Sequence, residues 1–149
     1  MSVAPDQHLL PVILPAEKTP DSQHLLHRVD DKKSLSYYLF LPANISEKSR
    51  VIVCVHGISR NAKEQINAFR ERANQFDYII IAPHFSRKYY QGYQRLEVGA
   101  AGYTPVEALH RMLDDVHKKY AVKTEKFSLF GYSGGAQFAH RYALFHPEK

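Results

Sequence analysis

The chain has 149 residues, which is enough for one domain. Apolar residues make up 44% of it and charged residues 23%, which excludes wholesale disorder, and the single cysteine, Cys54, excludes an intramolecular disulfide framework. The net charge is +5, but Lys and Arg are interleaved with acidic residues, so no basic patch predicts binding to nucleic acid.

The first 23 residues are polar and interrupted by prolines, and we expect an irregular lead-in before a domain that spans residues 24–149. This beginning lacks the basic stretch of a signal peptide, and Pro11 and Pro15 interrupt its short apolar patch. The longest apolar runs of the chain are about five residues, well below the ~20 that a membrane-spanning helix needs. We therefore expect a cytoplasmic protein that has no membrane partner.

Five segments carry the pattern of a β-strand: residues 24–29, 35–41, 51–55, 78–82 and 126–130. A polar turn separates the first two of them. The last three are continuous apolar runs without polar alternation, which indicates strands that are covered on both faces, as in a parallel sheet. The sequence therefore predicts a sheet with a buried parallel part.

Helical patterns alternate with these strands. Asn61 and Glu64 resemble a capping pair at the start of the first helix. The second helix has a stronger start signal, in which Thr104 is the N-cap, Pro105 occupies the first turn and Glu107 stands at the third position. The alternation of strands and helices predicts an α/β fold with right-handed parallel crossovers.

The third helix begins at Gly134 and has two distinct faces. Small residues form one face, and aromatic residues form the neighbouring face: Ala136, Ala139 and Ala143, then Phe138, Tyr142 and Phe145. We expect the small face to press closely against the sheet and the aromatic residues beside it to be partly covered.

The segment from residue 127 to residue 136 joins an apolar strand, the motif G-Y-S-G-G and this helix. G-x-S-x-G between a strand and a helix predicts a nucleophile elbow, a tight and strained turn that projects the serine. Ser133 is then the nucleophile at the helix N-terminus, with Tyr132 before it, while Gly131 and Gly135 leave room for the strand and the helix to approach. An ordinary Gly/Ser turn is the structural alternative.

A second strand-to-turn segment supplies candidates for an oxyanion hole, which needs two hydrogen-bond donors. One donor in an elbow architecture is the backbone N–H after the nucleophile, here Gly134, and the other comes from a loop after an upstream strand. His56-Gly57 opens such a loop, so the Ile58 N–H is the second candidate and Ser59 its substitute. We expect His56 to order this loop by hydrogen bonds rather than to act as a base or metal ligand.

Taken together, His56-Gly57, the Ala82-Pro83 that follows a strand, and Gly131 to Gly135 resemble the N-terminal half of the α/β-hydrolase superfamily. The likeness covers residues 34–149 and lies with the polyhydroxybutyrate-depolymerase-like and feruloyl-esterase-like branch. It implies an α/β fold with a mostly parallel sheet and helices on both faces. It also implies a serine hydrolase that cleaves small or polymeric carboxylic esters through an acyl-enzyme at Ser133, without a metal or cofactor.

The chain departs from this superfamily after the serine, where the triad acid and histidine are expected. Sixteen residues follow Ser133 and none is Asp. His140 and His146 lie roughly 10 and 20 Å along the helix axis, whereas a serine–base hydrogen bond spans about 2.6–3.2 Å. We therefore expect a truncated hydrolase that is inactive by itself, and whose elbow strand is left as an unpaired edge.

Residues 84–103 form a long connection that is rich in tyrosine. Tyr89, Tyr90 and Tyr93 are candidates to line an acyl or aromatic-alcohol pocket, and a surface excursion that packs on its own domain is an equal alternative. Two functional alternatives also stay open. One is a non-catalytic binding module that keeps the elbow, and the other is half of a split enzyme that a second chain completes.

Overall fold

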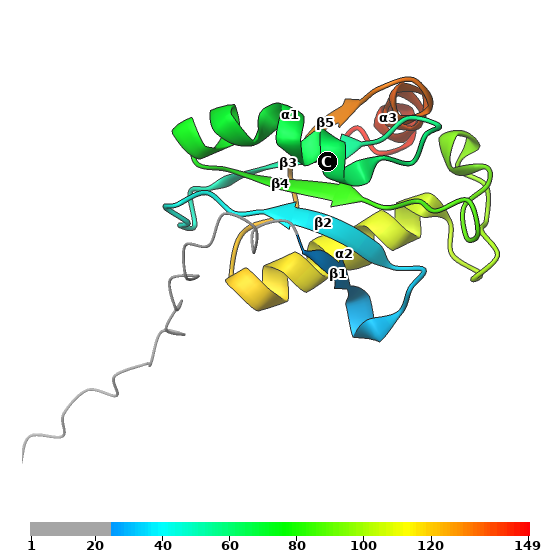
Figure 1. Cartoon of the computed structure of the whole chain (residues 1–149), viewed down its shortest axis with the longest axis horizontal. Coiled ribbons are helices and arrows are strands. Elements are labelled where there is room, and N and C mark those ends of the chain that lie inside the picture. The colour runs from blue at the N-terminus through cyan, green and yellow to red at the C-terminus, as the bar shows by residue number, and fades with distance from the viewer. Residues whose placement is uncertain (1–24) are drawn as a thin grey trace, which may run out of the picture.

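The computed structural model describes residues 25–149 (Figure 1). The strands are β1 (Leu26–Arg28), β2 (Ser36–Phe40), β3 (Arg50–Val55), β4 (Tyr78–Pro83) and β5 (Ser128–Gly131). The helices are α1 (Ala62–Gln75), α2 (Pro105–Tyr120) and α3 (Gly134–Phe145), with short 3₁₀ turns η2 (Val29–Asp31) and η3 (Tyr93–Arg95). All five predicted strands and all three predicted helices are confirmed, but the predicted lead-in of residues 1–23 lies outside the described residues.

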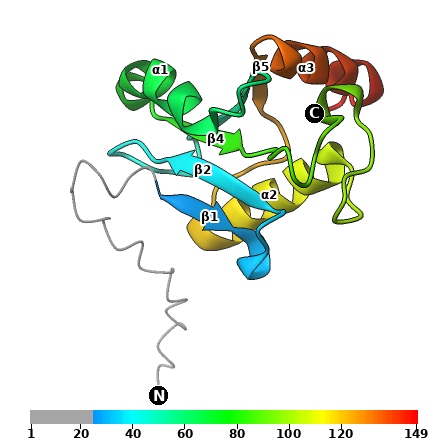
Figure 2. The same ribbon diagram turned by 45° about the vertical axis from the view of Figure 1, so that its right-hand side comes forward.

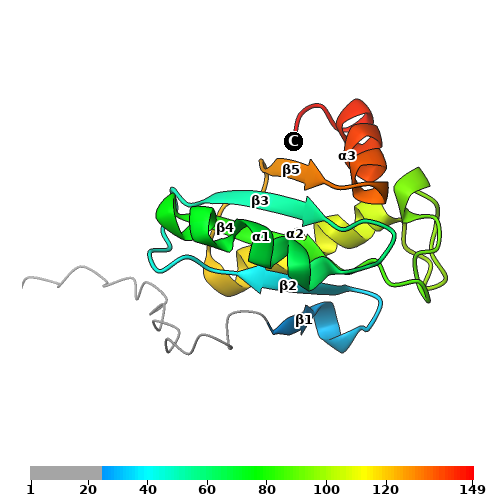
Figure 3. The same ribbon diagram turned by 45° about the horizontal axis from the view of Figure 1, so that its top comes forward.

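The strands form one sheet in the order β1-β2-β4-β3-β5 (Figure 3). β3 runs parallel to both β4 and β5, so that Val53 lies opposite Ile81 on one side and Leu129 on the other. β2 runs antiparallel to both of its neighbours. The α/β class and the parallel crossovers are confirmed, and the short hairpin of β1 and β2 makes the described sheet mixed rather than mostly parallel.

The central strands are apolar throughout because helices cover both faces of the sheet. Figure 1 shows α1 on one face and α2 on the other. Val53 and Ile81 belong to the core that α2 covers, whereas the neighbouring Cys54 and Ile80 belong to the smaller core under α1. The expectation of helices on both faces is therefore confirmed, and the carboxyl ends of β3 and β5 are held side by side.

The two helix-start signals have different outcomes. Thr104 forms the predicted capping box with Glu107, since its hydroxyl accepts from the Glu107 N–H at 3.1 Å and its own N–H donates to the Glu107 carboxylate at 2.8 Å. Asn61 makes no side-chain bond to the backbone of α1 and instead donates to the Glu64 carboxylate. The signal at Thr104 therefore indicates a capping box, whereas the signal at Asn61 indicates only a contact between two side chains.

The orientation of α3 reverses our expectation for its two faces. Gly135, Phe138 and Tyr142 are buried, whereas Ala136 and Ala143 are exposed. The elbow places Gly135 against the end of β3, and positions three and seven residues further on continue the same stripe of the helix. The aromatic residues therefore face the core, except for Phe145, which is 70% exposed.

β5 lies at the edge of the sheet and pairs only with β3 within the described residues (Figure 3). Ser128 is exposed, and Phe130 retains 36% exposure although its ring packs 4.7 Å from that of Phe69. An apolar edge strand with free backbone groups is a template for the addition of another strand.

Candidate active site

Ser133 occupies the turn between β5 and α3 with φ 53° and ψ −116°, a backbone conformation that L-residues rarely adopt. The predicted strained elbow is confirmed at the level of the backbone. Two glycines make the turn possible. A Cβ on Gly131 would overlap the Gly135 carbonyl, and a Cβ on Gly135 would overlap the backbone oxygen of Val55.

The loop after β3 meets the elbow beside Ser133. A Cβ built on Gly57 would lie 3.4 Å from the Ser133 Cβ and equally close to the ring of Tyr132. The backbone N–H groups of Ile58 and Gly134 donate to no other group within residues 25–149. The structure thus leaves both proposed oxyanion donors available next to the serine, with the Gly134 N–H at the positive end of α3.

His56 orders the loop after β3 through two hydrogen bonds of its ring. Its side chain is fully buried, its Nδ1–H donates to the Gly57 carbonyl at 2.9 Å, and its Nε2 accepts from the Phe85 N–H at 3.0 Å. Burial lowers the pKa of His56 to about 4, with a smaller contribution from the charge of Arg60, so the ring is neutral at pH 7. His56 therefore has the loop-ordering role that the sequence predicted.

Arg60 is a second residue that joins the two loops, and the sequence analysis missed it. Its guanidinium donates to the carbonyls of Phe85 and Tyr90 at 2.6 and 2.9 Å and lies 4.4 Å from the centre of the Tyr93 ring. Its backbone has a φ of 63°, which is uncommon for a residue with a side chain. These partners lie 25 to 33 positions away in the chain, so no local signal marks them.

The structure places two of the three candidate pocket tyrosines in the core. Tyr90 and Tyr93 are each 1% exposed, and their hydroxyls donate to the carbonyls of Ser34 at 2.7 Å and His56 at 2.9 Å. A buried tyrosine with its hydroxyl satisfied by backbone serves packing, so the pocket prediction is wrong for these two. Tyr89 is half-buried against the same core, and the loop packs on its own domain beside α3 (Figure 2).

Within residues 25–149, the Ser133 hydroxyl makes no hydrogen bond. Two histidines have other partners: the half-buried His110 bonds to the Tyr142 hydroxyl at 2.8 Å, and the exposed His117 donates to the Val122 carbonyl at 2.7 Å. His140 is exposed on α3. None of the histidines in the described part of the chain is paired with the serine.

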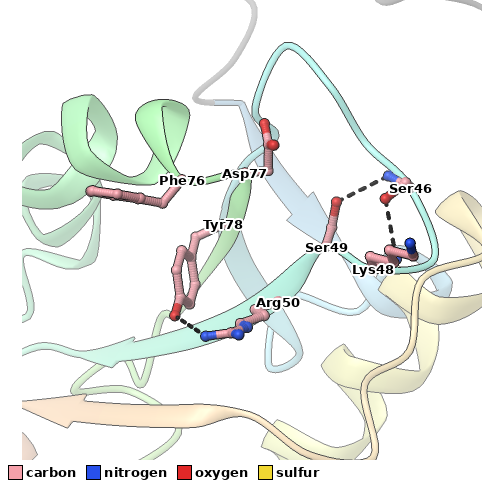
Figure 4. A pocket seen from close by; sticks show the side chains of 7 residues that line it. All are labelled: Ser46, Lys48, Ser49, Arg50, Phe76, Asp77 and Tyr78. Carbon is pink, nitrogen blue, oxygen red and sulfur yellow. Dashed lines mark hydrogen bonds between the residues drawn. The ribbon is translucent and has the colours of Figure 1, made fainter.

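Two cavities of the described residues lie away from Ser133. One, of about 460 Å³, opens where β3 and β4 begin, at the opposite end of the sheet from the elbow (Figure 4). Arg50 donates to the Tyr78 hydroxyl at 3.3 Å on its wall. The other, of about 440 Å³, lies between α2 and the segment that leads into β5.

No three His, Cys, Asp or Glu side chains of residues 25–149 are grouped as ligands of a metal ion. No helix in this range has both the length and the apolar character needed to cross a membrane.

Several known proteins with related sequence or structure are hydrolases. The poly(3-hydroxybutyrate) depolymerase of Bordetella parapertussis superposes with a TM-score of 0.58 at 26% identity, and poly(aspartic acid) hydrolase-1 of Sphingomonas sp. KT-1 with a TM-score of 0.63 at 24% identity. The chain has the α/β-hydrolase fold. Feruloyl esterase B of Talaromyces funiculosus is 26% identical over 144 residues, so the relationship is with the esterases of this superfamily. No family model matches the chain.

The likeness covers most of this chain but less than half of each relative. The aligned region spans 94% of this chain and 40% of the feruloyl esterase. It spans 71% of this chain and 40% of the depolymerase, and 76% of this chain and 47% of the poly(aspartic acid) hydrolase.

Proposed function

We propose that this chain is the nucleophile-bearing part of a serine hydrolase that cleaves carboxylic esters, with Ser133 as the nucleophile. The observation that carries the proposal is the elbow itself. Ser133 has a left-handed φ at the start of α3, and two free backbone N–H groups, those of Gly134 and Ile58, lie on the segments that meet there. The esterase relatives support the same reaction class.

In the proposed reaction the Ser133 Oγ attacks the ester carbonyl carbon while its proton passes to a histidine. The negative charge that develops on the carbonyl oxygen is stabilised by the N–H groups of Gly134 and Ile58 and by the positive end of α3. The bond to the alcohol then breaks, and the histidine returns the proton to the leaving oxygen. Water hydrolyses the acyl-enzyme in the same manner and restores the serine.

The base and the acid of this proposed triad come from polypeptide other than these 149 residues. Two observations support this part of the proposal. The Ser133 hydroxyl has no partner among the described residues, and the feruloyl esterase, the depolymerase and the poly(aspartic acid) hydrolase are each more than twice as long as the region they share with this chain. A longer reading frame or a second chain can supply the missing groups, and the substrate is a small or polymeric ester.

Ester hydrolysis tests the proposal. The 149-residue chain and a protein carrying the natural continuation of the reading frame are assayed with 4-nitrophenyl acetate, each as the native sequence, as Ser133→Ala and as Ser128→Ala. Ser128 is an exposed serine on β5 and serves as the matched control. We expect turnover only in the extended protein, lost in Ser133→Ala and kept in Ser128→Ala.

Two results contradict the proposal in different ways. Turnover by the 149-residue chain that disappears in Ser133→Ala shows that a base lies within it. Absence of turnover in the extended protein, with the fold intact, supports a non-catalytic binding module.

A further inference from the structure

Within residues 25–149, the surface beside Ser133 carries more positive charge than its carboxylates neutralise. Residues 84–103 contain three cations, Arg87, Lys88 and Arg95, and one acid, Glu97. Glu97 pairs with Arg95 at 2.6 Å and therefore leaves the other two cations without a counter-charge. Arg60 adds a further positive charge from the loop after β3.

Among these cations, Arg87 contacts Ile58, whose N–H is a proposed oxyanion donor. Its Nη2 donates to the Ile58 carbonyl at 3.4 Å, and its side chain is exposed to solvent. Lys88 lies instead 5.3 Å from the centre of the Tyr89 ring. Arg87 thus contacts the very residue whose N–H is a proposed donor to the reacting carbonyl.

The electrostatic influence of these cations reaches the neighbouring titratable groups. Burial lowers the pKa of Arg60, and the charge of Arg87 lowers it further. Burial also lowers the pKa of His84, and the charge of Arg60 adds to this effect. Neither arginine forms a salt bridge within the described residues. The loops around the serine therefore create a positive potential, which attracts anions and orients them.

We propose that the substrate of this site carries a carboxylate close to the scissile ester, and that Arg87 binds this carboxylate with the charge of Arg60 behind it. This inference rests on the proposed function and names its substrate class. Arginine binds carboxylates through charge-assisted, often bidentate hydrogen bonds, and Arg87 makes only one long bond of its own, so its remaining N–H groups are free to bind. Because Arg87 contacts the Ile58 carbonyl, binding of the anion is coupled to placement of the ester carbonyl.

Binding to the 149-residue chain tests this inference without any need for turnover. ¹⁵N-labelled protein is titrated with monomethyl succinate, which has one carboxylate and one ester, and with dimethyl succinate, its neutral counterpart. We expect saturable shifts of the Ile58, Arg87 and Gly134 amide signals with the monoester alone. Arg87→Gln should weaken this binding about threefold to fivefold, as for an exposed ion pair. Arg50→Gln, at the other end of β3, should leave it unchanged.

Equal shifts with the two esters would overturn the inference, as would unchanged binding in Arg87→Gln. Failure of the binding test leaves the chemistry proposed for Ser133 untouched, because the hydrolysis assay uses a neutral ester. Conversely, if the 149-residue chain binds the monoester but the extended protein hydrolyses no ester, the anion site is retained and the proposed reaction is lost.

Discussion

The burial of His56 makes the stability of this fold depend on pH in a defined window. Burial lowers the pKa of the ring from 6.5 to about 4; hydrogen bonding to the Gly57 carbonyl opposes this shift, and the charges of Arg60 and His84 add to it. Above pH 6.5 the ring is neutral in both the folded and the unfolded chain. Between pH 6.5 and 4 the unfolded chain binds a proton that the folded chain excludes, so the free energy of unfolding falls as the pH falls.

The size of this effect follows from the two pKa values. A gap of about 2.5 between 6.5 and about 4 corresponds to ~3 kcal/mol, of which about 2.5 kcal/mol is lost between pH 7.5 and pH 4.5. Since a domain is stabilised by about 5–15 kcal/mol in total, one histidine accounts for a large share of the acid sensitivity.

Urea unfolding from pH 7.5 to pH 4.5 measures the effect. His56→Asn keeps a donor and an acceptor but does not titrate, so its pH dependence should be shallower than that of the native chain by about 2.5 kcal/mol. His140→Asn, which changes an exposed histidine on α3, should retain the native dependence. Burial also lowers the pKa of His27, His84 and His110, but these residues are present in every variant and cancel in the comparison. Equal slopes for His56→Asn and the native chain would refute the reasoning.

Three further predictions concern the contacts around the elbow. Gly135→Ala should lower the free energy of unfolding by about 1–3 kcal/mol in urea titration, because its Cβ would overlap the backbone at the end of β3; an unchanged midpoint would contradict the close approach. Phe138→Ala should lower the free energy of unfolding by about 3–5 kcal/mol in the same titration, because the ring is fully buried. Phe145→Ala should change it by no more than about 0.5 kcal/mol, since that ring is exposed. Equal losses would show that the assigned helix face is wrong. Arg60→Gln should speed hydrogen exchange at residues 85–91 by about tenfold through loss of its charged hydrogen bonds, and Arg50→Gln should not; unchanged exchange would exclude the role of Arg60 as a link between the loops.

Local patterns were sufficient to predict the elements and the elbow. The continuous apolar runs at β3 and β4 predicted strands covered on both faces. Successive side chains of a strand point to opposite faces of the sheet, so a run without polar residues indicates that both faces are buried. The glycines around Ser133 predicted its turn, because only residues without a Cβ allow the strand and the helix to approach so closely. His56 was assigned correctly for a similar reason, since a histidine between a buried strand and a glycine has little access to solvent.

Contacts between distant segments were beyond the reach of such patterns. Whether the alanine or the aromatic stripe of α3 faces the core depends on the rotation that the elbow imposes, and both stripes are apolar enough to satisfy the periodicity. Tyr90 and Tyr93 became core residues only because the carbonyls of Ser34, before β2, and of His56, just after β3, lie within reach of their hydroxyls. The partners of Arg60 could not be predicted either, because its guanidinium bonds to backbone carbonyls that only the tertiary structure brings close to it. The spacing of apolar residues predicts which side chains are buried. Which residues they contact depends on the tertiary structure, because the partners are distant in the sequence.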